Sequence, residues 1–265
     1  MVSADQTIKD YSIQWTRYPE NDGYYASLEL FRDICGPLLS ADDIQNSVTA
    51  ELGAGTGRVV NMLLDAGVAR VTAVEPSAAF VALRRNTAAR AAKITYVNDT
   101  ADHLPDGPYD LIVSFGVLDH IPDPKPALQR AFACLKPGGL MLVWIYGKEG
   151  NRLYLALFEP IRRLARYLPV PVLAAVCHVL TGLLSVYSWL CRFLPLPMSR
   201  YIRAVIGRYG WKHRFLTVFD QLNPSFAKYF TENEARDLLP RAGFINVSMY
   251  HRHGYSWTIK GQKPH

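Results

Sequence analysis

Residues 48–58 read VTAELGAGTGR, a short apolar run followed by glycines at positions 53, 55 and 57. Val48–Leu52 has the length of a buried strand, and Arg58–Ala66 repeats its apolar residues at helical spacing. Glycines remove side chains where a ligand must approach the backbone, and the start of the following helix offers unpaired N–H groups. The stretch therefore predicts a strand, a turn and a helix, with a ligand bound at the turn.

The alternation of strand and helix continues after this unit. Strands separated by helices imply right-handed crossovers and a mostly parallel sheet. Thr231 and Glu234 form a capping box that starts a last helix, which Gly243 ends. We predict further strands over 71–75, 94–98, 109–115, 140–146, 246–251 and 256–260, and helices over 77–92 and 127–135.

The composition is that of a globular protein, with 265 residues, 49% hydrophobic and 20% charged. Collagen-like, disordered and disulfide-scaffold proteins are excluded. The cysteines form no C-x-x-C pair, and the N-terminus has no basic start followed by an apolar run. We expect free thiols, no signal peptide and a cytoplasmic location. The cysteines are Cys35, Cys134, Cys177 and Cys191.

Residues 151–215 interrupt the alternation and divide the chain into three parts. This stretch looks wholly helical and carries nine Arg and one Lys against one acid, Glu159, so its net charge is +9. The whole chain carries +6, which leaves −3 for the rest. A basic segment on a mildly acidic body argues against nucleic acid as a partner. We expect residues 1–150 to form an N-terminal cap and the ligand-binding half of the sheet, and 216–265 to close it.

The ligand class follows from Glu51, Glu75 and the glycine spacing. Glu75 ends the second predicted strand, where a carboxylate can accept both hydroxyls of a ribose. A dinucleotide site prefers G-x-G-x-x-G, whereas this turn is G-x-G-x-G. Glu51 beside the turn would repel a pyrophosphate but can hold an ammonium. These features disfavour a nicotinamide dehydrogenase and favour a ligand with a ribose and an amino-acid tail.

Four motifs, in order, resemble those of class I S-adenosylmethionine-dependent methyltransferases. They are Glu51–Gly57, Glu75–Ser77, the fourth-strand motif Tyr109–Ile121 and the turn Leu135–Leu140. The resemblance implies an α/β Rossmann-like fold with a seven-stranded, mostly parallel sheet whose last strand runs antiparallel, and an α-helical insertion after the fifth strand. It also implies S-adenosylmethionine as the cofactor.

The resemblance assigns the cofactor contacts residue by residue. Gly53, Gly55 and Gly57 should pack under the methionine part, and Glu75 should bind the ribose. Pro76 or Ser77 should lie near the adenine, and Asp99 should accept the adenine amino group, with a backbone contact near Ala101 as the alternative. The predicted cofactor-binding residues are Glu51, Gly53, Ala54, Gly55, Gly57, Glu75, Pro76, Asp99, Thr100, Ala101, Phe115 and Gly116.

Three residues near the ends of the fourth and fifth strands are catalytic candidates. His120 is a candidate general base, because active sites of parallel sheets lie at this edge and imidazole titrates near neutral pH. A loop histidine that shapes the pocket is the alternative. Asp119 and Tyr146 are weaker candidates. His251 and His253 share one face of a strand, but their spacing alone supports no metal site, and we predict none.

The insertion contains Tyr167–Cys191, twenty-five residues without a formal charge apart from His178. Its length suggests a membrane span, but the strands after residue 214 must join the same sheet as those before 151, so a single span is disfavoured. A buried lid, a dimer surface and a peripheral membrane contact remain open. Trp15, Tyr18, Tyr24 and Tyr25 are expected to fold over the cofactor or to pack against the sheet.

We therefore expect a methyltransferase acting on an O, N or C atom of a small, hydrophobic or aromatic metabolite in a biosynthetic pathway. Two alternatives remain: an enzyme of this fold that uses S-adenosylmethionine for a non-methylating reaction, and a catalytically silent partner protein. The sequence does not fix the acceptor.

Overall fold

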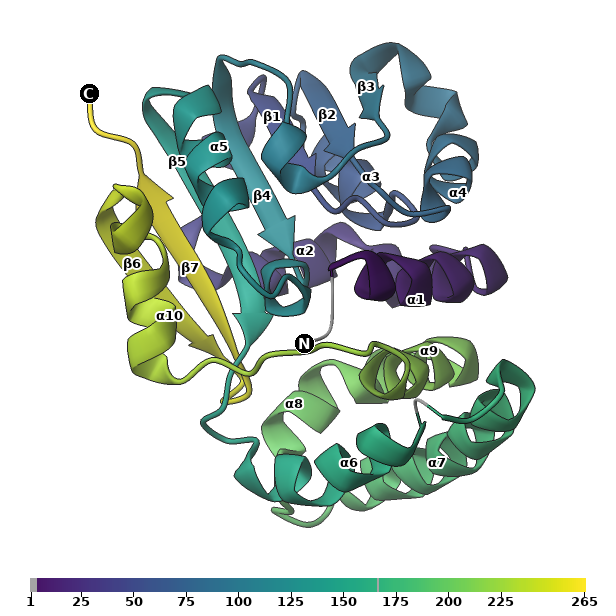
Figure 1. The fold of residues 1–265 in the computed structure, drawn as a ribbon. Helices are drawn as coiled ribbons and strands as arrows, with labels where there is room; N and C mark the ends of the chain where they lie inside the picture. Colours follow the sequence, from purple (N-terminus) through teal and green to yellow (C-terminus); the bar gives the residue numbers. More distant parts are fainter. Residues whose placement is uncertain (1–3, 166) are drawn as a thin grey trace.

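In the computed structural model, which describes residues 4–165 and 167–265, a seven-stranded sheet has the order β3-β2-β1-β4-β5-β7-β6 (Figure 1). β7 runs antiparallel to its neighbours β5 and β6, and the pairings among β1 to β5 are parallel. The sheet confirms the predicted fold class. The strands are β1 (Val48–Leu52), β2 (Arg70–Val74), β3 (Ile94–Val97), β4 (Tyr109–Phe115), β5 (Leu135–Tyr146), β6 (Ile245–Arg252) and β7 (Ser256–Gln262).

The strand order reverses between β1 and β4. From β1 the chain continues outward through β2 and β3, then returns to place β4 on the other side of β1. In open parallel sheets, ligands bind beyond the carboxyl ends of the strands at such a reversal. Leu52, at the end of β1, is followed directly by the glycine turn, so the topology places that turn where a ligand site is expected.

Helices cover both faces of the sheet and form a further layer. α2 and α3 pack on one face, and α5 and α10 on the other. The helices are α1 (Ala4–Arg17), α2 (Leu28–Cys35), α3 (Arg58–Asp65), α4 (Ala79–Asn86), α5 (Lys125–Cys134), α6 (Arg152–Ala165), α7 (Val170–Leu190), α8 (Ser199–Ala204), α9 (Trp211–Leu222) and α10 (Glu232–Leu238).

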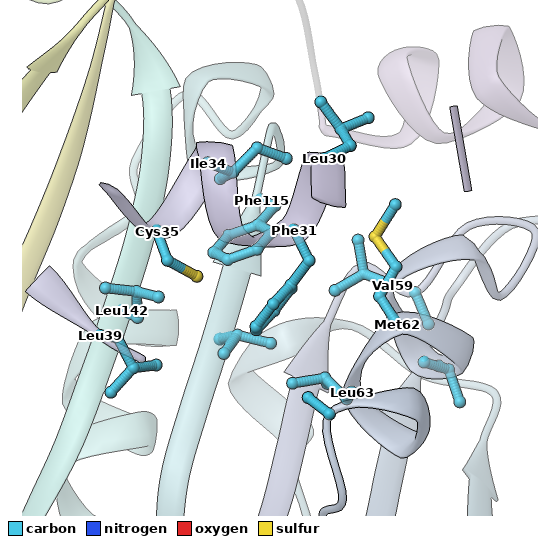
Figure 2. Packing of buried hydrophobic residues seen from close by; sticks show 14 of the residues in the cluster. Leu30, Phe31, Ile34, Cys35, Leu39, Val59, Met62, Leu63, Phe115 and Leu142 are labelled. Atoms are coloured by element: carbon cyan, nitrogen blue, oxygen red, sulfur yellow. The ribbon is translucent and has the colours of Figure 1, made fainter. Parts of the chain in front are cut away.

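The α2 face holds the larger core. Phe31 projects from α2 between the sheet and α3, where Leu63 and Phe115 meet it (Figure 2). Each fully buried side chain of this size contributes about 1.5–3 kcal/mol. Asp33, also on α2, accepts hydrogen bonds from the buried Arg252 Nε at 2.9 Å and pairs with His253 Nε2 at 2.7 Å. These contacts tie α2 to the end of β6.

The insertion forms a layer of its own below the sheet, with α9 lying between it and α1 (Figure 1). α7 packs along α9 through a small separate core that includes Leu173, Cys177, Phe215 and Phe219. α9 runs through residue 215, the predicted end of the insertion, and reaches Leu222. The helical layer is therefore continuous with the segment that leads back to the sheet.

Most predicted elements shift by one or two residues, and two differ more. The helix over 77–92 divides into α4 and a 3₁₀ segment at Ala88–Lys93, with Thr87 between them at φ −112° and its hydroxyl bonded to the Leu83 carbonyl at 2.7 Å. β5 starts at Leu135, five residues before the predicted strand, since the pairing shifts register between Tyr109 and Leu111. The residues between Leu135 and Leu140, predicted as a turn, are therefore accommodated within β5 by an irregular pairing with β4. The four cysteines are buried and unpaired, as expected.

Candidate functional site

A cavity of about 1140 Å³ lies beyond the carboxyl ends of β1, β2, β4 and β5. The glycine turn after β1 and Glu75 after β2 form its floor, and Tyr146 ends β5 at its edge. α1 and the insertion close it from the other sides. This is the place where the order of the strands predicts a ligand site.

The three glycines of the turn have left-handed backbone, with φ of 72°, 53° and 86° at Gly53, Gly55 and Gly57. A Cβ on Gly53 would approach Val117 to 2.5 Å, whereas one on Gly55 would meet nothing nearer than Trp15 Nε1 at 3.9 Å. Gly53, Ala54 and Gly55 line the cavity.

Gly57, which was predicted to pack under the methionine part of the cofactor, lies away from the cavity. It is absent from the cavity wall and starts α3, where a Cβ would approach Thr87 to 2.8 Å and Leu83 to 2.9 Å. The position needs glycine because α3 and α4 pack closely there. Its contribution to the site is therefore indirect, through the placement of the turn.

Glu75 connects the turn to the end of β2. Its Oε2 accepts a hydrogen bond from Gly55 N at 2.7 Å, and its Oε1 accepts one from Ser77 N at 2.9 Å. The side chain is buried and lines the cavity. Because each carboxylate oxygen has a second lone pair, Glu75 can hold the turn and still accept hydrogen bonds from a ligand.

Glu51 is a second buried carboxyl in the cavity wall. Burial raises the pKa of Glu51 well above its ordinary value, and the positive charge of Arg58 opposes this only in part. Its Oε2 makes no hydrogen bond within the described residues. A buried oxygen without a partner in a cavity wall is suited to a cationic or hydrogen-bond-donating ligand group.

The structure places the Asp99 side chain away from the cavity. The Asp99 side chain is 50% exposed, bonds to His103 Nδ1 at 2.8 Å and does not line the cavity. Its neighbours Thr100, Ala101 and Asp102 do line it. The 3₁₀ turn at Ala101–His103 carries Asp102 to the cavity instead, so the carboxylate at this edge lies three residues further along. Pro76, Ser77, Phe115 and Gly116 line the cavity as well.

His120 lies in the cavity wall with one ring nitrogen already used. Its Nδ1 is 3.0 Å from the carbonyl oxygen of Phe226, which can only accept, so Nδ1 carries the proton. In the neutral ring, Nε2 is then the unprotonated nitrogen. Tyr11 packs edge-on against the ring, with centroids 5.0 Å apart. This tautomer is the one that a base acting through Nε2 requires.

Asp119 stands behind His120, outside the cavity wall. It is fully buried, and its nearest carboxylate oxygen is 3.7 Å from His120 Nε2. Burial raises the pKa of the Asp119 carboxyl to about 6, although the neighbouring His120 works in the opposite direction. Asp119, the weaker catalytic candidate, therefore lies outside the cavity wall, and we propose that any effect it has passes through His120.

Tyr146 belongs to a polar network that the sequence did not reveal. Its hydroxyl donates to Asp220 Oδ2 at 3.2 Å and accepts from Gln221 Nε2 at 2.9 Å. Gln14 of α1 donates to Asp220 Oδ1 at 2.7 Å, and Tyr229 donates to Gln221 Oε1 at 2.6 Å. Gln14 and Asp220 are 206 residues apart in the sequence, so no local pattern predicts their contact.

The aromatic residues of the N-terminus divide between two roles. Trp15 and Tyr25 line the cavity, whereas Tyr18 packs edge-on against Phe215 and Phe219 of α9. Tyr11, one turn before Trp15, stacks on it and reaches His120. A row of side chains on α1 therefore connects the glycine turn with the candidate base.

The insertion supplies the apolar half of the cavity wall. Tyr154 lies at the boundary between the polar and the apolar parts of the wall. Its hydroxyl bonds to Gln221, and its ring stacks on Phe158. Beyond it the wall is aliphatic and aromatic, with Leu153, Leu157, Ile161, Leu180, Leu183 and Leu184 from α6 and α7. Polar groups thus gather near the sheet edge and apolar groups near the insertion.

His251 and His253 do not converge. His253 Nε2 bonds to Asp33, and the ring of His251 stacks on Trp257 with centroids 4.0 Å apart. Among residues 4–165 and 167–265, no group of three or more His, Cys, Asp or Glu side chains is arranged to hold a metal ion.

Comparisons with known proteins agree with this geometry. Residues 50–143 match the family model of a methyltransferase domain. The chain is 32% identical over 123 residues to the ubiquinone/menaquinone biosynthesis C-methyltransferase of Haemophilus ducreyi, covering 45% of this chain and 44% of that one. It is 30% identical over 109 residues to a ubiquinone biosynthesis O-methyltransferase of Bradyrhizobium, covering 40% and 43%. The chain thus spans under half the length of these curated relatives.

Solved structures share the fold over nearly the whole chain. Magnesium protoporphyrin IX methyltransferase from Synechocystis, with bound S-adenosylhomocysteine, superposes with a TM-score of 0.58 at 13% identity, over 98% of this chain and 100% of that one. A methyltransferase from Thermotoga maritima superposes at 0.51 with 18% identity, over 95% and 93%. Residues 50–143 are thus similar to a methyltransferase domain, and the sheet that contains them has the fold of solved methyltransferases.

Proposed function

We propose that this protein transfers a methyl group from S-adenosylmethionine to an O, N or C atom of a small acceptor with a polar ring and an apolar remainder. One observation carries the proposal. The glycine turn, the candidate base and the apolar wall of the insertion all line one cavity of about 1140 Å³. A cofactor and an acceptor of this kind fit end to end in such a space.

The residues of the turn fit the cofactor. Gly55 leaves its Cβ position open toward Trp15, so a ligand can approach the backbone there. Glu51 would hold the ammonium of the amino-acid tail, because its unpaired buried oxygen lacks a partner. Glu75 would accept the ribose hydroxyls with the lone pairs that Gly55 N and Ser77 N leave free. When bound, S-adenosylmethionine supplies an electrophilic methyl group.

The acceptor half of the cavity supports an amphipathic substrate. Burial raises the pKa of the Tyr11 and Tyr146 hydroxyls well above the ordinary value, so both stay protonated, with the Tyr146 proton donated to Asp220. The Tyr11 hydroxyl is buried and makes no hydrogen bond within the described residues. A hydroxyl or carbonyl on the acceptor ring would pair with it. Quinone precursors have this chemistry, as do polyketides and lipid-linked precursors, and the curated relatives are named for ubiquinone or menaquinone biosynthesis.

The chain's catalytic contribution is positioning, exclusion of water and removal of one proton. α1 and the insertion enclose the acceptor, which brings its nucleophilic atom to the reacting end without competing water. Where the acceptor must lose a proton, His120 Nε2 takes it, since Nδ1 is held by the Phe226 carbonyl. We propose a cytoplasmic location.

The first test measures transfer of labelled methyl groups to hydroxylated aromatic acceptors that carry alkyl tails of increasing length. Burial of each CH₂ is favourable by about 0.8 kcal/mol, so kcat/KM should rise at least tenfold between no tail and a tail of about ten carbons. Mass spectrometry of the product should show one added methyl group. Equal turnover of all tail lengths would contradict an apolar chamber, and a product without the methyl would favour the non-methylating alternative.

A second prediction concerns Glu75. Glu75→Ala should weaken S-adenosylmethionine binding at least tenfold, about 1.4 kcal/mol, because it removes the ribose acceptor and the bond that holds Gly55. Glu75→Gln should lie in between, since it keeps one oxygen. Isothermal calorimetry measures both affinities. Asp99→Ala is the control and should bind normally, because Asp99 faces solvent; the reverse order would return the contact to Asp99.

A third prediction follows from the raised pKa of Glu51. A ligand ammonium favours the carboxylate and should lower this raised pKa. Cofactor binding should therefore release protons in the pH range between the pKa values of the bound and free protein, and none at higher pH, where the carboxyl of the free protein is already ionised. Calorimetry in two buffers of different ionisation enthalpy measures the release. Glu51→Gln should abolish it, and equal enthalpies for the wild-type protein would be evidence against an ammonium at Glu51.

A fourth prediction separates catalysis from positioning at His120. His120→Ala should lower kcat by about a hundredfold or more while cofactor affinity changes little. His120→Asn keeps an N–H for the Phe226 carbonyl but has no basic nitrogen. Its kcat should be as low as that of the alanine variant. Recovery of kcat in His120→Asn would show that the ring serves to hold the loop at Phe226.

A further inference from the structure

The outer surface of the insertion is apolar along two neighbouring helices. By length and composition, α7 could cross a membrane, with a mean hydropathy of 1.9 over its most apolar window of 18 residues. Only 17% of that window is buried in the protein. The core helix of a globular protein would be mostly buried. The inner face of α7 instead packs on α9, and its outer face carries exposed Val172, Val179, Val186 and Trp189.

These outer residues follow the helical repeat. Val172, Val179 and Val186 are each seven residues apart, which is about two turns, so they form one stripe. α6 lies beside α7 in the layer farthest from the sheet (Figure 1). It adds the exposed Leu157 and Leu164, again seven residues apart. The two stripes face solvent on the same layer, and we refer to these five residues with Trp189 as the outer face.

The acceptor chamber opens through this layer. Leu157 and Leu183 line the cavity and are also 59% and 62% exposed. Leu153, with 58% exposure, does the same at the start of α6. Residues that belong to both the wall and the surface mark an opening of the chamber. An apolar acceptor that enters there passes between apolar side chains along its whole path.

Arginines border the outer face. Arg152 and Arg163 are exposed on α6 and stand eleven residues apart, about three turns, so they share one side of that helix. Arg192 is exposed just after α7, beside Phe193, and Arg200 is exposed on α8. Apolar side chains bordered by cations are typical of helices that lie in the interface of an anionic bilayer.

We propose that the outer face of α6 and α7 docks on an anionic lipid surface and that the acceptor enters the chamber from the lipid. This docking proposal rests on the proposed function only for the identity of the acceptor that enters the chamber. Charge decides between a bilayer and a second copy of the chain. Arg163 pairs with Glu159 at 3.5 Å, and the other three arginines named above are exposed. Two copies placed face to face would oppose these arginines, whereas anionic headgroups would pair with them.

Peripheral docking also fits the connections of α7. Its inner face shares a core with Phe215 and Phe219 of α9, and α9 in turn is fixed to α1 through Gln14 and Asp220. A helix held on one side by protein can bury only its outer side in lipid. The protein therefore lies on the membrane with the sheet above it.

The experiment is flotation with lipid vesicles, with and without about 30 mol % phosphatidylglycerol in phosphatidylcholine. The double variant Val179→Asp/Val186→Asp changes the outer face and leaves the cavity wall intact. Val81→Asp is the control, because Val81 on α4 is 73% exposed but far from the insertion in sequence. We expect salt-sensitive binding of the wild-type protein and the control to anionic vesicles, and at least tenfold weaker binding of the double variant.

Activity gives a second readout that separates this proposal from the proposed function. The double variant should methylate a tail-less acceptor in water as the wild-type protein does, and should methylate a tailed acceptor in vesicles at least tenfold more slowly. Vesicle binding without methylation of any acceptor would support docking and count against the proposed function. Absence of binding to anionic vesicles at low salt would overturn docking. If sedimentation velocity showed a dimer for the wild-type protein and a monomer for the double variant, lipid docking would be overturned in favour of a second copy of the chain.

Discussion

The structure depends on one carboxylate that joins two turns at the reversal of the sheet. β2 and β4 lie on opposite sides of β1, and the chain leaving β1 turns through glycines in left-handed conformation. Glu75 holds that turn by accepting from Gly55 N on one oxygen and from Ser77 N on the other. Hydrogen bonds to a buried charged group are worth more than neutral ones, and losing such a partner leaves the orphaned group with its desolvation cost. Glycine supplies the shape of the turn, and Glu75 keeps it in one conformation.

This arrangement explains why the site's two acidic residues differ. Glu75 has both oxygens engaged by backbone N–H groups, so its role in the free protein is complete. Glu51 is as deeply buried but keeps one oxygen unpaired, a cost that folding alone does not offset. Polar groups left unsatisfied inside a protein are typical of sites that wait for a ligand. From this contrast we propose that the cationic end of the ligand lies at Glu51.

Local patterns predicted the sheet because strand, turn and helix signals are carried by adjacent residues. The five parallel strands and the capping box at Thr231 belong to this class, whereas the antiparallel last strand was implied by the family resemblance. Predictions that depended on the direction in which a residue faces were less accurate. Gly57 packs against α4, and the Asp99 side chain turns to solvent and pairs with His103, because sequence spacing alone does not give the direction in which a turn presents a residue. Asp220 and Gln14 were out of reach, because their contact exists only once α1 and α9 have packed together.

The insertion shows how one apolar segment can serve two surfaces. A run without charge such as Tyr167–Cys191 does not reveal how much of it packs inward, because periodicity is weak when both faces are apolar. In the fold, Leu173 and Cys177 pack on α9, Leu180 and Leu184 line the chamber, and Val179 and Val186 face outward. Exposed apolar stripes of this extent favour association and are a liability in free solution. Their retention on the helices that wall the chamber makes sense if the chamber is filled from an apolar phase, since the path inward then never exposes the acceptor to water.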